Sequence, residues 1–139
     1  MNAVDTNVFI YALDLDEPLK QAKAQDLLDR LVHASGSTVL PWQVAGELLN
    51  NLRKREADGR ISASEVESRF RKFLSMFPLA MPTAQMFSTY FGLRSRFSLS
   101  HWDTMLLAAC KEVGVTTLYS EDMDSGTDYD GIKIINPFA

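Results

Sequence analysis

Cysteine and histidine are scarce in this chain of 139 residues. The sequence contains one cysteine, Cys110, and two histidines, His33 and His101. Neither histidine has a second histidine or a cysteine at the spacing that zinc ligands use, so we do not expect a zinc site. Cys110 ends the apolar run that begins at Met105, and we expect it to pack as a small hydrophobic side chain.

Long apolar runs and leader-like segments are also missing. No apolar stretch approaches the roughly 20 residues that a membrane-crossing helix needs. A strand-like run starts at Met1 and leaves no room for a basic start, an apolar core and a cleavage site. We therefore expect a cytoplasmic protein that does not associate with membranes. With 46% hydrophobic residues and no repeats, residues 1–139 are expected to form one domain.

The charge is unevenly distributed. The net charge of −4 disfavours nucleic acid as a partner. However, residues 53–96 contain nine Lys or Arg and four Asp or Glu, a balance of +5, which leaves −9 for the remainder. A basic middle segment can hold a polyanion backbone. The alternative, that these cations only solvate helix faces, has equal weight at this point.

Strand-like and helix-like segments alternate along most of the chain. Alternation of this kind predicts the α/β class, with a short central parallel sheet sandwiched between helices. The segment 41–77 departs from simple alternation because it is helical without an intervening strand. We expect strands at about 1–4, 37–40, 79–81, 116–119 and 132–135, and helices at about 19–34, 41–58, 62–77, 83–96 and from 100 onward.

Four carboxylates lie at positions of such a fold where a negative charge needs a physical explanation. Asp5 closes the first predicted strand, and Asp122 follows the strand-like run 116–119. Ligands of parallel sheets bind beyond the carboxyl ends of the strands, which is where both acids lie. Asp103 falls inside the apolar stripe of its helix, and Glu47 lies at the edge of another stripe. If the four converge, their repulsion requires a cation, and a divalent metal with oxygen ligands is the simplest answer.

Each acid taken alone also has an ordinary structural explanation. Asp5 is suited to a strand-end turn or a helix N-cap, and Asp122 to an Asx turn. A glutamate at the boundary of a helix stripe, such as Glu47, is common. Ser100 and Asp103 together form a capping-box pattern, in which Asp103 accepts the backbone N–H of Ser100.

Short polar and large aromatic residues flank these acids. Thr6 and Asn7 follow Asp5, and Ser120 precedes the fourth acid. They are candidates for holding a carboxylate rotamer or a metal-bound water, although a turn or cap role is favoured for Asn7. Trp42 and Trp102 each lie near the start of a helix. Core packing is the default expectation for both, and base stacking is the minor alternative.

Four segments in order resemble the PIN-domain family over nearly the whole chain. They are Val4–Tyr11, the Pro41–Val44 run ahead of Glu47, Ser98–Cys110, and Leu118–Met123 with the terminal Ile135–Phe138. Each segment is a weak signal, but four in the right order are a strong one. In length and ending the chain is most similar to the VapC-type toxins of bacterial and archaeal toxin–antitoxin pairs.

The resemblance implies a Mg²⁺- or Mn²⁺-dependent endoribonuclease that acts on RNA, forms a homodimer and is neutralised by a small antitoxin. It implies that Asp5, Glu47, Asp103 and Asp122 are the catalytic, metal-binding quartet. Asp5 and Asp103 are the expected direct ligands, and the other two act through water or on a second ion. The chain departs from many relatives in having Ser120 in place of Thr. The fourth ligand stays open because extra acids lie nearby: Glu121, Asp124, Asp128 and Asp130.

Two other classes of protein remain as alternatives. A doubly wound phosphohydrolase or phospho-acceptor needs Asp-x-Asp after its first strand, and Asn7 breaks that pattern. A non-catalytic interaction module could keep the same fold without chemistry. Within nucleases, the residues do not distinguish an RNA-directed from a DNA-directed enzyme.

Overall fold

A six-stranded sheet runs through the centre of the chain in the computed structural model, which describes residues 1–34 and 36–139. Its strand order is β3-β2-β1-β4-β6-β5. The central position belongs to the N-terminal strand, which pairs with both β2 and β4. The strands are β1 (Asn2–Val4), β2 (Thr38–Pro41), β3 (Leu79–Ala80), β4 (Thr117–Tyr119), β5 (Asp128–Tyr129) and β6 (Ile132–Ile135).

All neighbouring strands are parallel except β5, which pairs antiparallel with β6. The predicted α/β class with a central, mostly parallel sheet flanked by helices is thereby confirmed. Parallel pairing sends the carboxyl ends of β1 and β4 to the same edge of the sheet. Val4 lies opposite Tyr119 at that edge, so the residues that follow each of them are neighbours.

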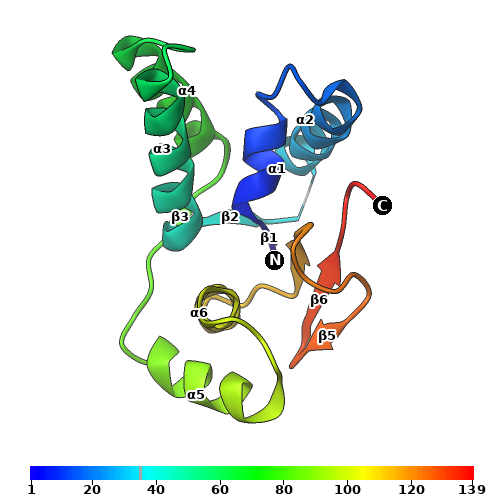
Figure 1. Cartoon of the computed structure of the whole chain (residues 1–139). Helices are drawn as coiled ribbons and strands as arrows, with labels where there is room; N and C mark the ends of the chain where they lie inside the picture. The colour runs from blue at the N-terminus through cyan, green and yellow to red at the C-terminus, as the bar shows by residue number, and fades with distance from the viewer. Residues whose placement is uncertain (35) are drawn as a thin grey trace.

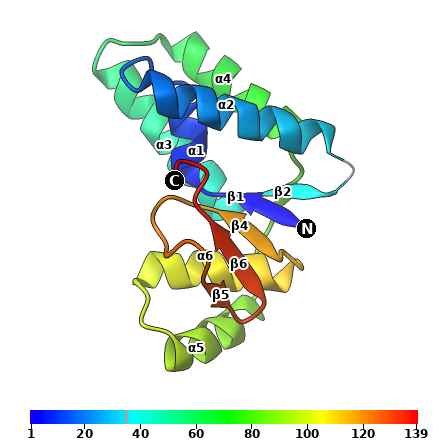
Figure 2. The same ribbon diagram turned by 90° about the vertical axis from the view of Figure 1, so that its right-hand side faces the viewer.

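Helices cover both sides of the sheet. Figures 1 and 2 show α1 to α4 on one side and the α5–α6 pair on the other, so the molecule has three layers. Each predicted helix is present, including two successive helices in the segment 41–77. The helices are α1 (Thr6–Tyr11), α2 (Pro18–His33), α3 (Trp42–Ala57), α4 (Ala63–Met76), α5 (Met86–Arg96) and α6 (His101–Glu112). No helix among the described residues has the length and apolarity needed to cross a membrane.

Local sequence signals explain where several helices begin. Pro18 occupies the first turn of α2, where its missing N–H costs nothing. Ser62 forms the predicted capping box of α4, accepting from the backbone of Glu65 while the Glu65 carboxylate accepts from the backbone of Ser62. Helix α5 begins at Met86, three residues later than expected.

The sequence missed two short elements. The first is α1, which starts directly after Asp5, where a turn or a helix cap was expected; Asp5 is the N-cap, and no helix was predicted to follow it. The second is β5, which a tight turn through Asp130 (φ 56°) and Gly131 (φ 96°) connects to β6. A positive φ at two successive positions favours Asp-Gly, and this turn folds β5 back against β6.

The core lies on both sides of β1 and β4. Ala3, Val4 and Leu118 are fully buried in these strands, and Phe9 of α1 packs edge-on against Phe73 of α4. Cys110 is 1% exposed and packs with the apolar side chains, as predicted. The short helix α1 is therefore held by tertiary packing, since an isolated helix of this length is unstable.

Candidate active site

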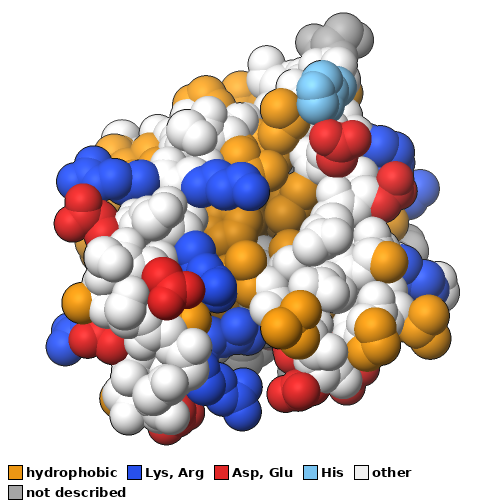
Figure 3. All heavy atoms as spheres, turned by 90° about the horizontal axis from the view of Figure 1, so that it is seen from above, with side chains coloured by type: hydrophobic (Ala, Val, Ile, Leu, Met, Phe, Trp, Pro, Cys, Tyr) orange, Lys and Arg blue, Asp and Glu red, His pale blue; other side chains and the backbone are white. Residues whose placement is uncertain are grey.

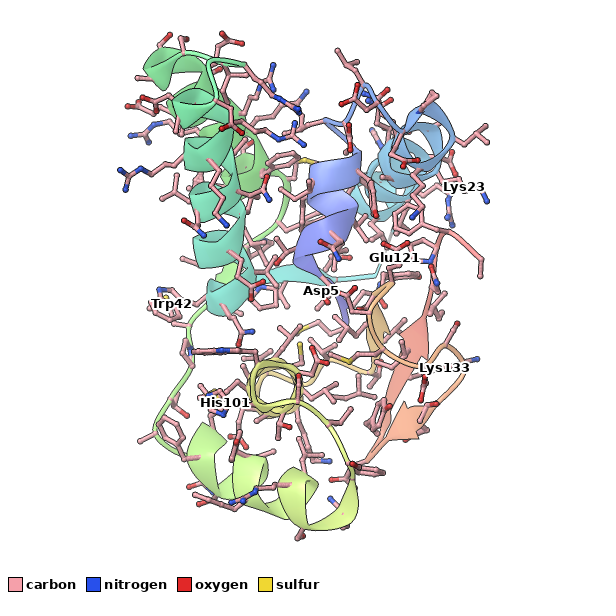
Figure 4. The ribbon with its side chains drawn as sticks, in the orientation of Figure 1. Asp5, Lys23, Trp42, His101, Glu121 and Lys133 are labelled. Atoms are coloured by element: carbon pink, nitrogen blue, oxygen red, sulfur yellow. The ribbon has the colours of Figure 1, made fainter. Side chains whose placement is uncertain are left out.

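Asp5 lies at the carboxyl end of the central strand and begins α1 as its N-cap. One carboxylate oxygen, Oδ1, accepts from the backbone N–H of Thr6 at 2.7 Å, and Oδ2 accepts from the Ser120 hydroxyl at 2.8 Å. The backbone N–H of Asp5 donates to the carbonyl of Tyr119, which continues the pairing of β1 with β4. Its side chain is only 6% exposed. Figure 4 shows Asp5 at the foot of α1, facing the space between α3, α6 and the loop of Glu121.

Glu47 reaches the same region from α3. Its Oε2 accepts from the hydroxyl of Thr6 at 3.1 Å, and its Oε1 accepts from the Gln43 amide at 3.0 Å. The first contact joins residues 41 positions apart in the chain, and the second joins successive turns of α3. Thr6 thus donates its N–H to one acid and its hydroxyl to another.

Asp122 is held from two directions. The Asn7 amide donates to Oδ2 of Asp122 at 2.9 Å, and the backbone N–H of Asp122 donates to the Ser120 hydroxyl at 3.2 Å. Ser120 is completely buried and in turn donates to Asp5. One serine hydroxyl therefore links the loop after β4 to the carboxylate at the end of β1.

Asp103 enters from the first turn of α6 and is half-buried. The Ser100 hydroxyl accepts from the backbone N–H of Asp103 at 3.2 Å, which is the N-cap half of the predicted capping box. The reciprocal bond, from the backbone N–H of Ser100 to the Asp103 carboxylate, does not occur among the hydrogen bonds of the described residues. The cap therefore uses the backbone of Asp103 and leaves its carboxylate outside the box.

Electrostatic effects connect the four acids. Burial raises the pKa of Asp5 to about 6, against the hydrogen bonds from Ser120 and Thr6, and the charges of Asp122 and Glu47 raise it further. Burial also raises the pKa of Asp122, with added repulsion from Asp103, Glu121 and Glu47 and an opposing hydrogen bond from Asn7. Asp122, Glu47 and Asp103 thus each raise the pKa of another acid of the quartet.

The chemistry of this donor set fits a divalent cation. The four groups are oxygen donors of one charge, two of them have raised pKa values, and Mg²⁺ and Mn²⁺ prefer such ligands. In the described part of the chain, however, no three His, Cys, Asp or Glu side chains are arranged so that they could hold an ion. The hydrogen bonds from Thr6, Asn7 and Gln43 hold Glu47 and Asp122 in the positions seen here.

Three of the four extra acids around the fourth position have other partners, and Asp124 is exposed. Glu121 accepts from Lys20 at 2.5 Å, and the Lys20 ammonium lies over the rings of Tyr11 and Phe138. Asp128 accepts from the backbone of Gly131 in the β5–β6 turn. The carboxylate of Asp130 binds Arg96 and Lys111, and these cations lower its pKa.

Hydrogen bonds among the described residues link six of the seven predicted site residues beyond the carboxyl ends of β1 and β4, whereas Asp103 is related to them only through its charge, which raises the pKa of Asp122. Their roles differ in part from expectation. Asn7, for which a turn or cap was favoured, instead belongs to α1 and bonds to a carboxylate. The sequence missed Gln43 and Lys20. The spacing of Gln43 one helical turn before Glu47 was a usable signal, whereas nothing in the sequence relates Lys20 to residue 121.

The expectation of core packing was wrong for both tryptophans. Trp42 is 56% exposed and Trp102 is 63% exposed. Both stand at the first turn of their helices, Trp42 in α3 and Trp102 in α6.

Comparison with known proteins identifies the family to which the chain belongs. The model of the PIN domain matches residues 3–125, which is most of the chain. No curated protein sequence matches.

Three solved structures share the fold. The VapBC2 complex of Rickettsia felis, bound to a promoter DNA fragment, has a TM-score of 0.69 at 14% identity and covers 96% of both chains. A toxin–antitoxin complex from Klebsiella pneumoniae has a TM-score of 0.69 at 18% identity, with 99% of this chain and 98% of that chain covered. VapC20 of Mycobacterium tuberculosis, described as a toxin that cleaves the sarcin–ricin loop, has a TM-score of 0.65 at 16% identity, with 89% and 92% covered. These TM-scores show a shared fold, and because the PIN-domain model matches residues 3–125, the chain belongs to the PIN-domain family.

Proposed function

We propose that this protein is a metal-dependent endoribonuclease and the toxin of a toxin–antitoxin pair. The observation that carries the proposal is Asp5, a carboxylate 6% exposed at the end of the central strand whose pKa is raised and whose neighbours are further acids. Perturbed carboxylates gathered at such an edge are typical of functional sites. Membership of the PIN family and structural similarity to VapC toxins support the same function.

Mg²⁺ or Mn²⁺ is the proposed cofactor, with Asp5 and Asp103 as direct ligands and Glu47 and Asp122 acting through water or on a second ion. When bound, such an ion supplies an activated water and neutralises charge on the phosphate and the leaving oxygen. Asp122 is preferred as the fourth acid because Asn7 holds it and Asp103 raises its pKa. Glu121, Asp128 and Asp130 are engaged by cations or by a turn.

The surrounding polar residues would fix the acids before substrate arrives. Ser120 and the Thr6 backbone engage both oxygens of Asp5, so its rotamer is set. Thr6 and Gln43 do the same for the two oxygens of Glu47. Carboxylates held in this way lose little freedom on binding an ion, and outer partners of this kind commonly contribute 10- to 100-fold to metal affinity or activity.

A groove on the α1–α4 side is the proposed seat of the antitoxin. It has a volume of about 860 Å³ and an apolar floor that includes Leu28, Phe73 and Met76. Figure 3 shows the hollow with hydrophobic side chains at its base and Lys and Arg along one side. The cations are Arg55, Arg60, Arg69 and Lys72 from the α3–α4 hairpin, and the acids Asp14, Asp16 and Asp29 also line the groove, with Asp16 3.9 Å from Arg60.

This lining suits a partner segment with apolar anchors and acidic residues turned toward α3 and α4. The homodimer implied by the resemblance stays a prediction, which the mass of the protein in solution tests.

The test is cleavage of labelled RNA and DNA of the same sequence, in Mn²⁺ and in chelator. We expect RNA to be cut only with metal. The variants Asp5→Asn and Asp122→Asn should lose this activity, whereas Asp124→Asn, at an exposed acid of the same loop, should keep it. Cleavage that survives in Asp5→Asn would refute the assignment, and cleavage of DNA alone would make the protein a DNA-directed nuclease.

One observation favours a second candidate, a non-catalytic module with the same fold. No three acidic side chains among the described residues are arranged to hold an ion. Calorimetric titration with Mn²⁺ separates the two functions. Binding that is lost in Asp103→Asn supports the nuclease, and the absence of binding in both proteins supports the module.

A further inference from the structure

A pocket lined by exposed aromatic side chains lies beside the acids. Its volume is about 330 Å³, and its walls include Trp42, Phe87, Trp102 and Met105. Trp42, Trp102 and Phe87 are 56%, 63% and 52% exposed. Large aromatic rings that cluster on a protein surface are typical of a binding site.

The pocket shares residues with the candidate active site. Gln43 lines it, and the amide nitrogen of Gln43 donates both to Oε1 of Glu47 at 3.0 Å and to the carbonyl of Trp102 at 3.2 Å. Trp102 directly precedes Asp103, and Trp42 lies about 7.5 Å along the axis of α3 from Glu47. In Figure 4, Trp42 and His101 lie on the side of Asp5 opposite Glu121. A molecule seated in the pocket therefore adjoins the carboxylates.

A chain of aromatic contacts supports one wall. The ring of His101 meets the Trp102 indole edge-on with centroids 4.7 Å apart, and the Tyr90 hydroxyl bonds to Nδ1 of His101 at 2.8 Å. The Tyr90 ring in turn packs edge-on against Phe91. The orientation of the Trp102 indole is thus restrained although much of it is exposed, which is how a stacking platform is prepared.

We propose that this pocket takes an unpaired base of the nucleic acid, next to the phosphodiester bond held at the acids. The inference rests on the proposed nuclease function. No Asp, Glu, Lys or Arg lines the pocket within the described residues, which fits a neutral ring better than a phosphate or a charged peptide. The faces of Trp42 and Trp102 supply stacking, and the amide oxygen of Gln43 is placed to accept a hydrogen bond from a base edge.

This arrangement has a consequence for substrate choice. A base can enter an aromatic pocket only when it is not stacked in a duplex, so the base beside the cleaved bond must be single-stranded or turned outward. The protein should therefore cut loops and single strands and leave duplexes intact.

Fluorescence provides a direct measurement, because Trp42 and Trp102 are the two tryptophans of the whole sequence. The full-length protein in chelator is titrated with single-stranded RNA and with the same oligonucleotide lacking its bases. Quenching by the RNA but not by the abasic strand is expected, and the variants Trp42→Phe and Trp102→Phe assign the signal. Equal or absent responses to the two strands overturn the base-binding inference.

Cleavage kinetics form the second arm. Trp102→Ala should lower kcat/KM for RNA about 5- to 150-fold, the range that corresponds to about 1–3 kcal/mol per stacked base. The same variant should reduce cleavage far less when the substrate has an abasic nucleotide beside the cleaved bond. The control is Leu19→Ala, an apolar side chain 80% exposed on α2 that does not line the pocket.

The outcomes separate this inference from the proposed function. Cleavage of RNA that is insensitive to Trp102→Ala keeps the nuclease and removes the base pocket. Base-dependent quenching without cleavage keeps the pocket and removes the nuclease. A Trp102→Ala variant that changes the mass of the protein in solution identifies the surface as a contact between copies and overturns the inference.

Discussion

Replacing Asp5 with asparagine should abolish cleavage and at the same time stabilise the metal-free protein. The carboxylate is buried and lies near Asp122 and Glu47, and its pKa rises from 3.8 to about 6 in the fold. A raised pKa means that the ionised form is less favourable in the folded than in the unfolded state. The asparagine amide has the same shape and no charge. It can still accept from Thr6 and can donate to the Ser120 hydroxyl.

The size of the expected stabilisation follows from the shift in the pKa of Asp5. About two pKa units correspond to about 3 kcal/mol above pH 7, which is an upper value because asparagine forms weaker hydrogen bonds than a carboxylate. We therefore expect Asp5→Asn to raise the free energy of unfolding by about 1–3 kcal/mol in chelator at pH 7.5. For a chain of this size that is a rise in melting temperature of roughly 3–10 °C.

The pH dependence of the stability difference between Asp5→Asn and the unsubstituted protein tests its sign. The stability associated with protonated Asp5 is fully present below about pH 4 and is lost as the pH rises through about 6. The advantage of Asp5→Asn should therefore be largest above pH 7 and should shrink toward pH 4. Urea unfolding at pH 7.5, 6 and 4.5 measures it, with Asp124→Asn as the exposed control. A variant that is destabilised equally at all three values would refute the reasoning.

Two further predictions concern charges outside the quartet. Lys20→Met should lower the melting temperature, and more so at low salt, because Glu121 loses the cation that neutralises it. Lys23→Met should have little effect in the same thermal scan, because the one side-chain hydrogen bond of Lys23 within the described residues is a 3.5 Å bond to the carbonyl of Phe138. Asp130→Asn should lower stability at pH 7, and since two cations lower the pKa of this acid in the fold, the difference should begin to shrink below about pH 4 and should vanish only at much lower pH. Equal stability of the two proteins at pH 7 in urea unfolding would show that the ion pairs contribute nothing.

The sequence predicted the α/β class and most elements because local signals agreed with the global pattern. Ser62 and Glu65 indicated the start of α4, and Pro18 indicated the first turn of α2. The two missed elements are too short for periodicity to reveal. The six residues of α1 cover less than two turns, and β5 has two residues, although the Asp130-Gly131 pair was a readable hairpin signal.

The candidate site was predictable in part. Strand ends identified Asp5 and Asp122, since any parallel sheet gathers those positions. The contact between Thr6 and Glu47 was not predictable, because it depends on how α3 packs against α1. The exposure of Trp42 and Trp102 was misjudged because large aromatic residues are buried on average, and only tertiary packing shows which helix starts project from the core.

The hydrogen bond from Ser120 to Asp5 joins distant parts of the chain, and it therefore affects when the candidate site can be complete during synthesis. Ser120 and Asp5 are 115 positions apart, and Asn7 reaches Asp122 over the same span. A ribosome-bound chain that has emerged only through α5 contains Asp5 but lacks the strand β4 that pairs with β1, the hydroxyl of Ser120, and the carboxylates of Asp103 and Asp122. Under the proposed function, premature termination or proteolytic loss of the last twenty or so residues should yield fragments without cleavage activity, so the order of translation itself would delay the onset of activity.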